Sequence, residues 1–418
     1  MYNETHRMEE KISAGIIGKS DSERCLMASK PTKIMFAISD TGGGHRSAAA
    51  SIIAALDKEP SIQSTIVDFL RTTNFPGLRK APEIYDYCSK NHVWLNNLFF
   101  KKTNSINRIK ALTSIVYFQS RYSIKQTIAN SKPDAVVAVH PLVIGLLHQT
   151  RKASRGTWPI IAVVTDLVTI HASWATPGAD VYLVPTQDAF QSLIQYGIPY
   201  SQIIYTGFPV HPKFRDFPIS KQQACGELGI KSDAYTVLLT GGGVGAGNMR
   251  DWVHTLKAQC PDKQILVITG NNKELYNELK KSNSHFDGLH VYGFVDNMEK
   301  LMAASDVIVS KAGPGTLMEG VTMKKTLIVT EAVGIQETGN IDFITKNQLG
   351  YHCPTPKEAC KRINQIANSA SYGNLTYKDV SAINGSQNIA DIILDTMNAA
   401  IAANPSMQSH EKQIFIGA

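Results

Sequence analysis

Three glycine-rich turns, each between an apolar segment and a helical one, are the parts of this chain best suited to chemistry. Glycines at the start of a helix expose backbone N–H groups at the positive end of the helix dipole, which favours phosphate or another anion. One such turn indicates little, because every open α/β sheet needs tight turns. Three of them, near His45, Lys311 and Glu319, predict two nucleotide-fold domains that face one cleft. The turns are Gly42-Gly43-Gly44-His45-Arg46, Gly241-Gly242-Gly243-Val244-Gly245-Ala246-Gly247 and Lys311-Ala312-Gly313-Pro314-Gly315-Thr316.

The C-terminal half carries the strongest signal. A helix predicted to begin at Gly315-Thr316 suits a diphosphate, and Glu319 follows one helical turn later, where a carboxylate can accept hydrogen bonds from ribose hydroxyls. Gln336 and Glu337 follow the next strand and offer a sugar ring fixed donors and acceptors. The predicted donor-binding set is Gly43, Gly44, Gly242, Gly243, Gly245, Phe294, Val295, Lys311, Gly313, Gly315, Thr316, Glu319, Gln336, Glu337 and Asn340.

Strands that alternate with helical segments must position these residues. Continuous apolar runs such as 134–139 and 236–240 are typical of buried parallel strands. Further strands are predicted over 33–39, 65–69, 159–165, 180–185, 202–206, 264–269, 289–294, 306–310 and 326–330. This alternation predicts parallel sheets wound on both faces.

The length of 418 residues favours two domains. We expect a loose tail over 1–30, an N-terminal Rossmann-like domain over 31–212, a C-terminal one over 213–385, and a helix and tail over 386–418 that packs on either domain. The proline cluster at 207–212 is the predicted junction.

Charge is concentrated in residues 71–125, which hold ten basic and two acidic residues, a net +8 in a chain of net +7. Aromatic residues interleave with these cations, and the pattern predicts a surface for an anionic partner. We favour membrane lipids, because no recognised nucleic-acid-binding fold accompanies the patch. The six cysteines lie far apart, as in a reduced cytosolic protein, and no apolar run reaches membrane-spanning length.

Several motifs together resemble a known family. The stretch 292–302, the turn at 311–319 and the segment 334–340 resemble the nucleotide-sugar site of glycosyltransferases related to the peptidoglycan N-acetylglucosaminyltransferase. The segments 39–48, 165–174 and 207–210 resemble more closely the entry, acceptor-side and junction motifs of monogalactosyldiacylglycerol synthases. The resemblance covers about residues 33–385.

The resemblance implies a GT-B fold, with the nucleotide sugar bound mainly to the C-terminal domain and the lipid acceptor to the N-terminal one. It implies an inverting transfer of a hexose, galactose from UDP-galactose, to 1,2-diacylglycerol by a peripheral protein on the cytoplasmic face of a membrane. His45 is the expected general base, and Asp166 is either the competing base or the group that orients the acceptor. Backbone N–H groups would support the phosphates, so no metal or other cofactor is expected. The acceptor and membrane set is His171, Trp174, Trp94, Phe99, Phe100, Lys101, Lys102 and Arg108.

Other activities remain open. Within the class, the donor can be UDP-glucose, or N-acetylglucosamine can pass to a polyprenyl-linked acceptor. A UDP-sugar 2-epimerase shares the two-domain fold and needs no membrane surface. A membrane-bound sugar-nucleotide sensor predicts binding without turnover. A dinucleotide-dependent dehydrogenase is disfavoured, since a clean GxGxxG followed by an acid about 20 residues later is absent.

Overall fold

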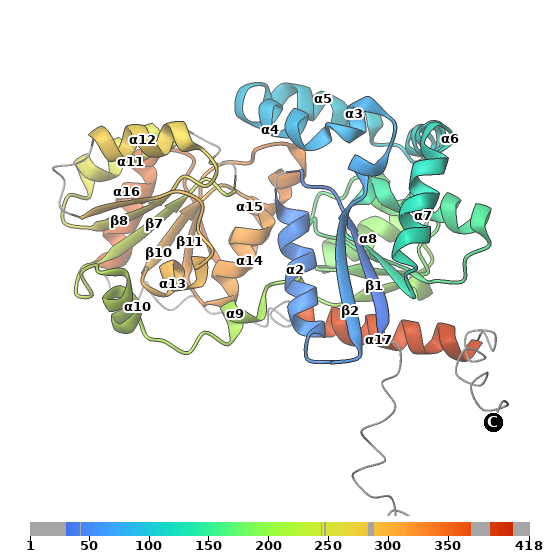
Figure 1. Cartoon of the computed structure of the whole chain (residues 1–418). Coiled ribbons are helices and arrows are strands. Elements are labelled where there is room, and N and C mark those ends of the chain that lie inside the picture. Colours follow the sequence, from blue (N-terminus) through green and yellow to red (C-terminus); the bar gives the residue numbers. More distant parts are fainter. Residues whose placement is uncertain are drawn as a thin grey trace, which may run out of the picture.

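The computed structural model describes residues 31–41, 43–243, 245, 248–282, 288–368 and 385–403. These residues form two parallel sheets that lie side by side, with helices on both faces of each (Figure 1). The predicted α/β fold with two Rossmann-like domains is therefore confirmed. The predicted tail over 1–30, the segment 404–418, and Gly42, Val244, Ala246 and Gly247 lie outside the described residues.

The N-terminal sheet has the strand order β2-β1-β3-β4-β5-β6, with every neighbouring pair parallel. Side chains of β1 alternate between two cores, with Met35 in one and Phe36 in the other, so both faces of the sheet are buried. This explains why its strands are continuous apolar runs. Their bounds are β1 Thr32–Ile38, β2 Ile62–Asp68, β3 Ala135–Ala138, β4 Ile160–Val163, β5 Val181–Val184 and β6 Ile203–Tyr205.

Helices cover this sheet, and a group of them between β2 and β3 extends over the top of the molecule in Figure 1. The predicted basic segment forms that group, α3 to α6. The helices are α2 Gly44–Leu56, α3 Pro76–Arg79, α4 Ala81–Asn91, α5 Val93–Thr103, α6 Ile106–Ser131, α7 Pro141–Ser154 and α8 Gln187–Gln195, with short 3-10 turns η1 Leu70–Thr72, η2 Ala172–Ala175 and η3 Tyr200–Gln202.

The C-terminal sheet has the order β12-β11-β10-β7-β8-β9 and is also parallel throughout. Its strands are β7 Thr236–Thr240, β8 Gln264–Ile268, β9 Leu289–Tyr292, β10 Val307–Ser310, β11 Thr326–Val329 and β12 Gly350–His352. Its helices are α10 Lys221–Leu228, α11 Met249–Gln259, α12 Lys273–Ser282, α13 Met298–Ala303, α14 Pro314–Thr322, α15 Ile335–Lys346 and α16 Pro356–Ala367.

Each sheet has a point where the strand order reverses, between β1 and β3 in one and between β7 and β10 in the other. In open parallel sheets, ligands bind outside the carboxyl ends of the strands at this switch point. The fold therefore directs attention to the loops after β1, β3, β7 and β10.

The chain crosses between the sheets twice. The segment between β6 and β7 contains the predicted proline-rich junction and α9, Pro212–Arg215. The last helix, α17 Gly385–Ala403, returns to the N-terminal sheet and packs beside α2 (Figure 1). Ile389 and Ile393 are fully buried in the N-terminal core. The sequence left open on which domain this last helix packs, and the structure places it on the N-terminal domain.

Candidate active site

The donor side begins with the glycine-rich turn after β7. Gly242 and Gly245 both adopt positive φ angles, and the Gly245 N–H donates to the Gly242 carbonyl at 3.0 Å. A Cβ on Gly245 would lie 2.2 Å from the Thr269 carbonyl oxygen, so only glycine fits there. Gly243 is exposed, and its carbonyl accepts from the Asn271 N–H. The turn is thus held close to the end of β8, with its backbone at the switch point.

The second donor-side turn forms the start of α14. The helix begins at Pro314, with Gly313 as an N-cap that makes no side-chain hydrogen bond. A Cβ on Gly315 would meet nothing within 4 Å, so the space beside this N-terminus is open. Thr316 lies in the same first turn, and the free N–H groups there suit a phosphate.

Glu319 lies one turn further along α14. Burial raises the pKa of its carboxyl to about 7, the Lys213 ammonium pulls it down, and the Glu299 carboxylate pushes it up. Lys213 itself pairs with Glu299 at 2.7 Å. Glu319 is therefore a partly buried carboxyl beside the predicted phosphate site, as a ribose ligand would be.

A buried ion pair joins the α14 turn to α15. The Lys311 ammonium lies 2.5 Å from one oxygen of Glu337, and the other oxygen accepts from the Val333 N–H at 2.9 Å. Burial lowers the pKa of Lys311, but Glu337 together with Tyr85 and Glu331 outweighs this effect, so the pKa of Lys311 is raised. Asn340 is almost fully buried, and its Nδ2 donates to the Ala312 carbonyl at 2.8 Å. The Asn340 side chain therefore stabilises the turn before α14 and does not face open space.

Two other predicted donor residues lie on the loop after β9. Phe294 is 69% exposed, and Val295 packs against the core beneath the C-terminal sheet. The exposed ring offers a flat apolar surface on which a nucleobase can stack.

On the side predicted to take the acceptor, the switch point of the N-terminal sheet carries two histidines. His45 follows β1 in the first turn of α2, after the exposed glycines Gly43 and Gly44, and His140 follows β3. Their rings meet edge to face with centroids 4.8 Å apart. Nδ1 of His140 accepts from the Leu142 N–H, so His140 caps α7.

Both histidines are neutral at physiological pH. Burial lowers the pKa of His45 to about 4, against the smaller raising effects of the Val139 carbonyl and the Asp40 carboxylate. Burial and the neighbouring His45 lower the pKa of His140 well below its ordinary value. Nδ1 of His45 also lies 3.2 Å from Oγ1 of Thr165, the residue before Asp166.

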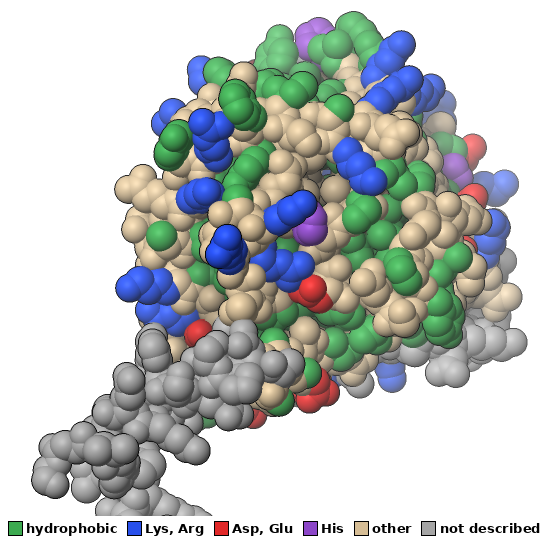
Figure 2. All heavy atoms as spheres, turned by 90° about the vertical axis from the view of Figure 1, so that its right-hand side faces the viewer, with side chains coloured by type: hydrophobic (Ala, Val, Ile, Leu, Met, Phe, Trp, Pro, Cys, Tyr) green, Lys and Arg blue, Asp and Glu red, His purple; other side chains and the backbone are tan. Residues whose placement is uncertain are grey.

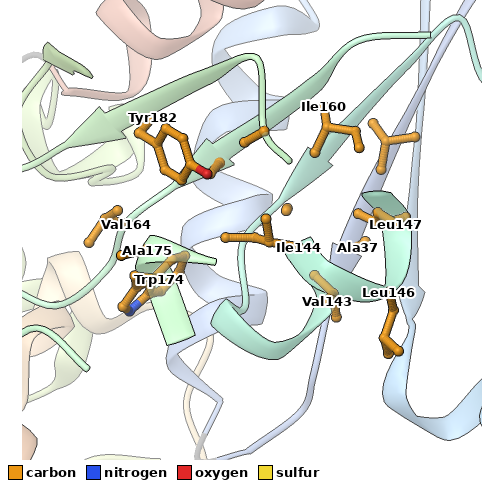
Figure 3. Close-up of a cluster of buried hydrophobic side chains, with 14 of the residues drawn as sticks. Ala37, Val143, Ile144, Leu146, Leu147, Ile160, Val164, Trp174, Ala175 and Tyr182 are labelled. Carbon is orange, nitrogen blue, oxygen red and sulfur yellow. The ribbon is translucent and has the colours of Figure 1, made fainter. Parts of the chain in front are cut away.

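Asp166 lies on the loop after β4. Burial raises the pKa of its carboxyl to about 6, the hydrogen bond from Trp174 lowers it, and the charge of Glu337 raises it. Nε1 of Trp174 donates to Oδ2 of Asp166 at 2.7 Å. Trp174 is fully buried, in a cluster that includes Val164 and Ala175 (Figure 3). The prediction that Trp174 touches the acceptor is therefore corrected. The Trp174 side chain is covered by protein, and its indole holds the Asp166 carboxylate in place through this hydrogen bond.

His171 and Phe100 also lie deeper than the sequence suggested. Their rings meet edge to face at 4.6 Å, and His171 is 9% exposed, with its ring nitrogens near Ser173, Thr103 and the Phe100 carbonyl. Phe100 was predicted to face a membrane, but its ring is partly buried against this loop. The periodicity of the sequence shows how apolar residues are spaced along a helix. It does not show which of them face the rest of the protein.

The two sides meet at α15. A Cβ on Gly339 would lie 2.7 Å from Cβ of Val168, two residues after Asp166. The helix α15 therefore packs directly against the loop between β4 and β5, residues 164–180, which we call the acceptor loop after its predicted role. Glu337 lies in the first turn of α15 and Asp166 lies on this loop, and the charge of Glu337 adds to the raised pKa of Asp166. The helices α2 and α14, whose N-termini carry His45 and Gly315, are also in contact.

Two family models match this chain. One described as Monogalactosyldiacylglycerol (MGDG) synthase matches residues 45–210, and one described as Glycosyltransferase family 28 C-terminal domain matches residues 236–331. Monogalactosyldiacylglycerol synthase 3, chloroplastic, of Arabidopsis thaliana is 31% identical over 340 residues, which cover 78% of this chain and 72% of that protein. The chain belongs to the monogalactosyldiacylglycerol synthase family.

A second member of this family, the probable monogalactosyldiacylglycerol synthase, chloroplastic, of Glycine max, is 31% identical over 343 residues. That match covers 79% of this chain but only 64% of the soybean protein. The fold is also found in UDP-GlcNAc 2-epimerase from Neisseria meningitidis bound to UDP-GlcNAc (TM-score 0.57, 15% identity, 88% of this chain and 100% of that one). A glycosyltransferase from Rickettsia africae is similar as well (TM-score 0.53, 14% identity, 90% and 99%). The GT-B fold is thus confirmed for this synthase-family chain.

The remaining predicted residues lie on the outside of this family member. Trp94 and Phe99 are 61% and 55% exposed on α5, and Lys101, Lys102 and Arg108 are exposed at and after its end. On α6, Arg121 stacks over the exposed rings of Phe118 and Tyr122. Figure 2, which views the side of α6 and α7, shows Lys and Arg spread among hydrophobic side chains with few acids between them.

In the described part of the chain, no helix has the length and apolar character to cross a membrane.

His140 and Thr165 are contacts that the sequence analysis missed. His140 directly follows the predicted strand 134–139, and Thr165 is the last residue of the predicted strand 159–165. A polar residue at the end of a buried strand is the feature of the sequence that could have indicated both. Among the described residues, no three His, Cys, Asp or Glu side chains are grouped as metal ligands would be.

Proposed function

We propose that this protein transfers galactose from UDP-galactose to the free hydroxyl of 1,2-diacylglycerol, with inversion at the sugar carbon. The proposal rests on one observation above the others: α15 of the C-terminal domain, which carries Glu337, packs on the loop of the N-terminal domain that carries Asp166. A carboxyl able to take a proton thus lies beside the residues that suit a sugar. The names of the two relatives support diacylglycerol as acceptor and galactose as the transferred sugar.

The donor would lie along the C-terminal switch point. Phe294 and Val295 would contact the base, Glu319 the ribose, and Gln336 and Glu337 the hexose. Lys311 and the N–H groups of the Gly242–Gly245 turn and of α14 would hold the diphosphate. These fixed dipoles and this cation would stabilise the departing nucleotide without a metal ion.

The reaction would be a single displacement. The hydroxyl oxygen of diacylglycerol attacks the anomeric carbon, and the bond from that carbon to the UDP oxygen breaks, so UDP leaves with the electron pair. The hydroxyl proton passes to a general base. A displacement from the opposite face converts the α-linked donor into a β-linked glycolipid.

Two side chains compete for the role of base. A general base works best when its pKa lies near the operating pH while the group is ionised. Asp166, with a pKa of about 6, meets that condition better than His45, with a pKa of about 4. The electrostatics therefore favour Asp166 as base, with His45 as a neutral hydrogen-bonding partner beside it.

The exposed aromatic and basic side chains of α5 and α6 would hold the protein on a membrane as a peripheral protein. Aromatic rings favour the interface, and cations favour anionic headgroups by about 1 kcal/mol each. The cytoplasmic face stays a prediction from the sequence.

The test is incubation of the purified protein with diacylglycerol in vesicles of phosphatidylcholine and phosphatidylglycerol. UDP-galactose, UDP-glucose and UDP-N-acetylglucosamine are supplied separately, with and without a chelator. Mass spectrometry of the lipid extract identifies the product, and NMR gives the anomeric configuration. We expect β-galactosyl-diacylglycerol, in equal yield with the chelator. An altered sugar nucleotide without a glycolipid would instead indicate the epimerase, and a glucosyl product would correct the donor.

A further inference from the structure

The helix that carries Gln336 and Glu337 has no N-cap of its own. Gly334 stands at the N-cap position of α15 with φ of 114°, and it makes no side-chain cap. The cap comes from the other domain: Oδ1 of Asn97, on α5, accepts from the Ile335 N–H at 3.0 Å. A residue 238 positions earlier thus fixes the first turn of the sugar-facing helix.

A second side chain from the N-terminal domain reaches the same turn. The hydroxyl of Tyr85, on α4, accepts from Nε2 of Gln336 at 3.4 Å. Lys311 and Glu337 lie close enough to Tyr85 to affect its ionisation in opposite directions. The Tyr85 side chain is only partly exposed, unlike the neighbouring aromatic side chain of Tyr87, which is 59% exposed. Tyr85 is one of the aromatic residues that interleave with the cations of residues 71–125, and it faces α15.

The helix α5 connects this turn with the acceptor loop. None of its described side chains is fully buried, and its contacts with the rest of the protein include hydrogen bonds of Asn97 and Thr103 and the ring of Phe100 on His171. Near its start Asn97 holds α15, and at its end Thr103 lies 3.2 Å from the His171 ring nitrogen. The loop that carries His171 also carries Asp166 and packs on Gly339 of α15. The first turns of α15 are therefore enclosed by α4, α5 and the acceptor loop, all from the N-terminal domain.

We propose that Asn97 and Tyr85 are positioning residues that complete the donor-sugar subsite from the acceptor domain. Asn97 holds the first turn of α15, and Tyr85 orients the Gln336 amide toward the hexose. This inference rests on the proposed function, since it assigns the hexose to Gln336 and Glu337. Asn97 contacts the first turn of α15, and Tyr85 contacts Gln336 in the same turn. Recognition of the sugar should therefore depend on these two residues more strongly than recognition of UDP does.

The test compares the affinities for UDP and for UDP-galactose by calorimetry, together with KM and kcat. Asn97→Ala should weaken UDP-galactose binding about five- to tenfold and leave UDP binding within about twofold, because the lost cap acts first on the turn that carries Gln336 and Glu337. Asn97→Asp keeps an acceptor oxygen and should restore the affinity. Tyr85→Phe should weaken UDP-galactose binding about threefold and reduce the preference over UDP-glucose. The matched controls are Asn107→Ala, an exposed asparagine on α6, and Tyr87→Phe on α4.

Equal losses for UDP and UDP-galactose, or no loss for either in Asn97→Ala and Tyr85→Phe, would overturn the inference. So would a wild-type protein that binds UDP-galactose no better than UDP. Failure of the proposed function is a different result: no glycolipid forms from any donor. The ratio of the two affinities then still reports on the subsite, because it requires no turnover.

Discussion

At the scale of single residues, the pair formed by Asp166 and Trp174 decides how this site can take up a proton. Burial favours the neutral carboxyl, whereas the indole N–H donates to the carboxylate and favours its charged form. The balance leaves the pKa at about 6. The carboxyl therefore loses its proton as the pH rises through about 6, and a base must be deprotonated to act.

Replacing Trp174 with Phe should move the pH profile in a direction fixed by this balance. The variant loses the hydrogen bond that lowers the pKa of Asp166, so that pKa should rise. The ascending limb of kcat/KM, with a midpoint of about 6 in the wild type, should shift to higher pH. The measurement is galactosyl transfer to diacylglycerol between about pH 5 and 9.

Two controls separate this effect from its alternatives. Asp166→Asn should lower kcat by about 10²–10⁴ with UDP binding retained. A thermal melt of Trp174→Phe checks that its buried cluster still folds. If His45 is the base, the Trp174→Phe variant keeps the wild-type midpoint, and His45→Ala shows the large loss of kcat instead.

At the scale of elements, α5 and the start of α6 present exposed cations beside exposed aromatic rings. Lys101, Lys102 and Lys110 are exposed, and Arg108 donates to the Lys102 carbonyl at the turn between the two helices. Exposed cations next to exposed aromatic rings are what a protein needs to bind an anionic lipid surface.

Neutralising Lys101, Lys102, Arg108 and Lys110 to Gln should weaken binding to phosphatidylglycerol-containing vesicles. At about 1 kcal/mol for each charge, the loss should exceed 100-fold at low salt and shrink as salt is added. Co-sedimentation with vesicles measures it. The matched control neutralises four exposed lysines of the C-terminal domain, Lys273, Lys280, Lys281 and Lys361. Equal losses in both variants would mean that net charge alone binds the lipid.

The sequence predicted the strands because parallel strands buried on both faces are continuous apolar runs, as in 236–240, which is β7. It missed β12, which has three residues and lies at the edge of the sheet. Local patterns also placed the glycine-rich turns, since a turn before a helix is a short-range feature. The roles of Tyr85, Asn97 and Trp174 depend on contacts with other parts of the fold, and no local pattern encodes them.

At the scale of the whole molecule, α17 ties the end of the described chain to the N-terminal domain. Oγ of Ser386 donates to the Val210 carbonyl at 2.7 Å, and Nδ2 of Asn388 donates to the Thr206 carbonyl at 2.9 Å. A Cβ on Gly385 would lie 2.1 Å from the Phe208 carbonyl oxygen, so the helix begins against the junction itself. The same helix packs beside α2, which carries His45 at its N-terminus.

Truncating the buried face of α17 should therefore destabilise the N-terminal domain and spare the donor site. Ile393 is fully buried, and Ile393→Ala should lower the free energy of unfolding by about 2–5 kcal/mol, the cost of lost burial and a residual cavity. Calorimetry with and without UDP measures it, because UDP should stabilise only the transition of the C-terminal domain. Asn398→Ala, on the exposed face of α17, is the control. Two transitions, with only the UDP-insensitive one lowered, would mean that the domains unfold separately. A single lowered transition with weakened UDP binding would contradict this, because it would show that the N-terminal core also supports the nucleotide site.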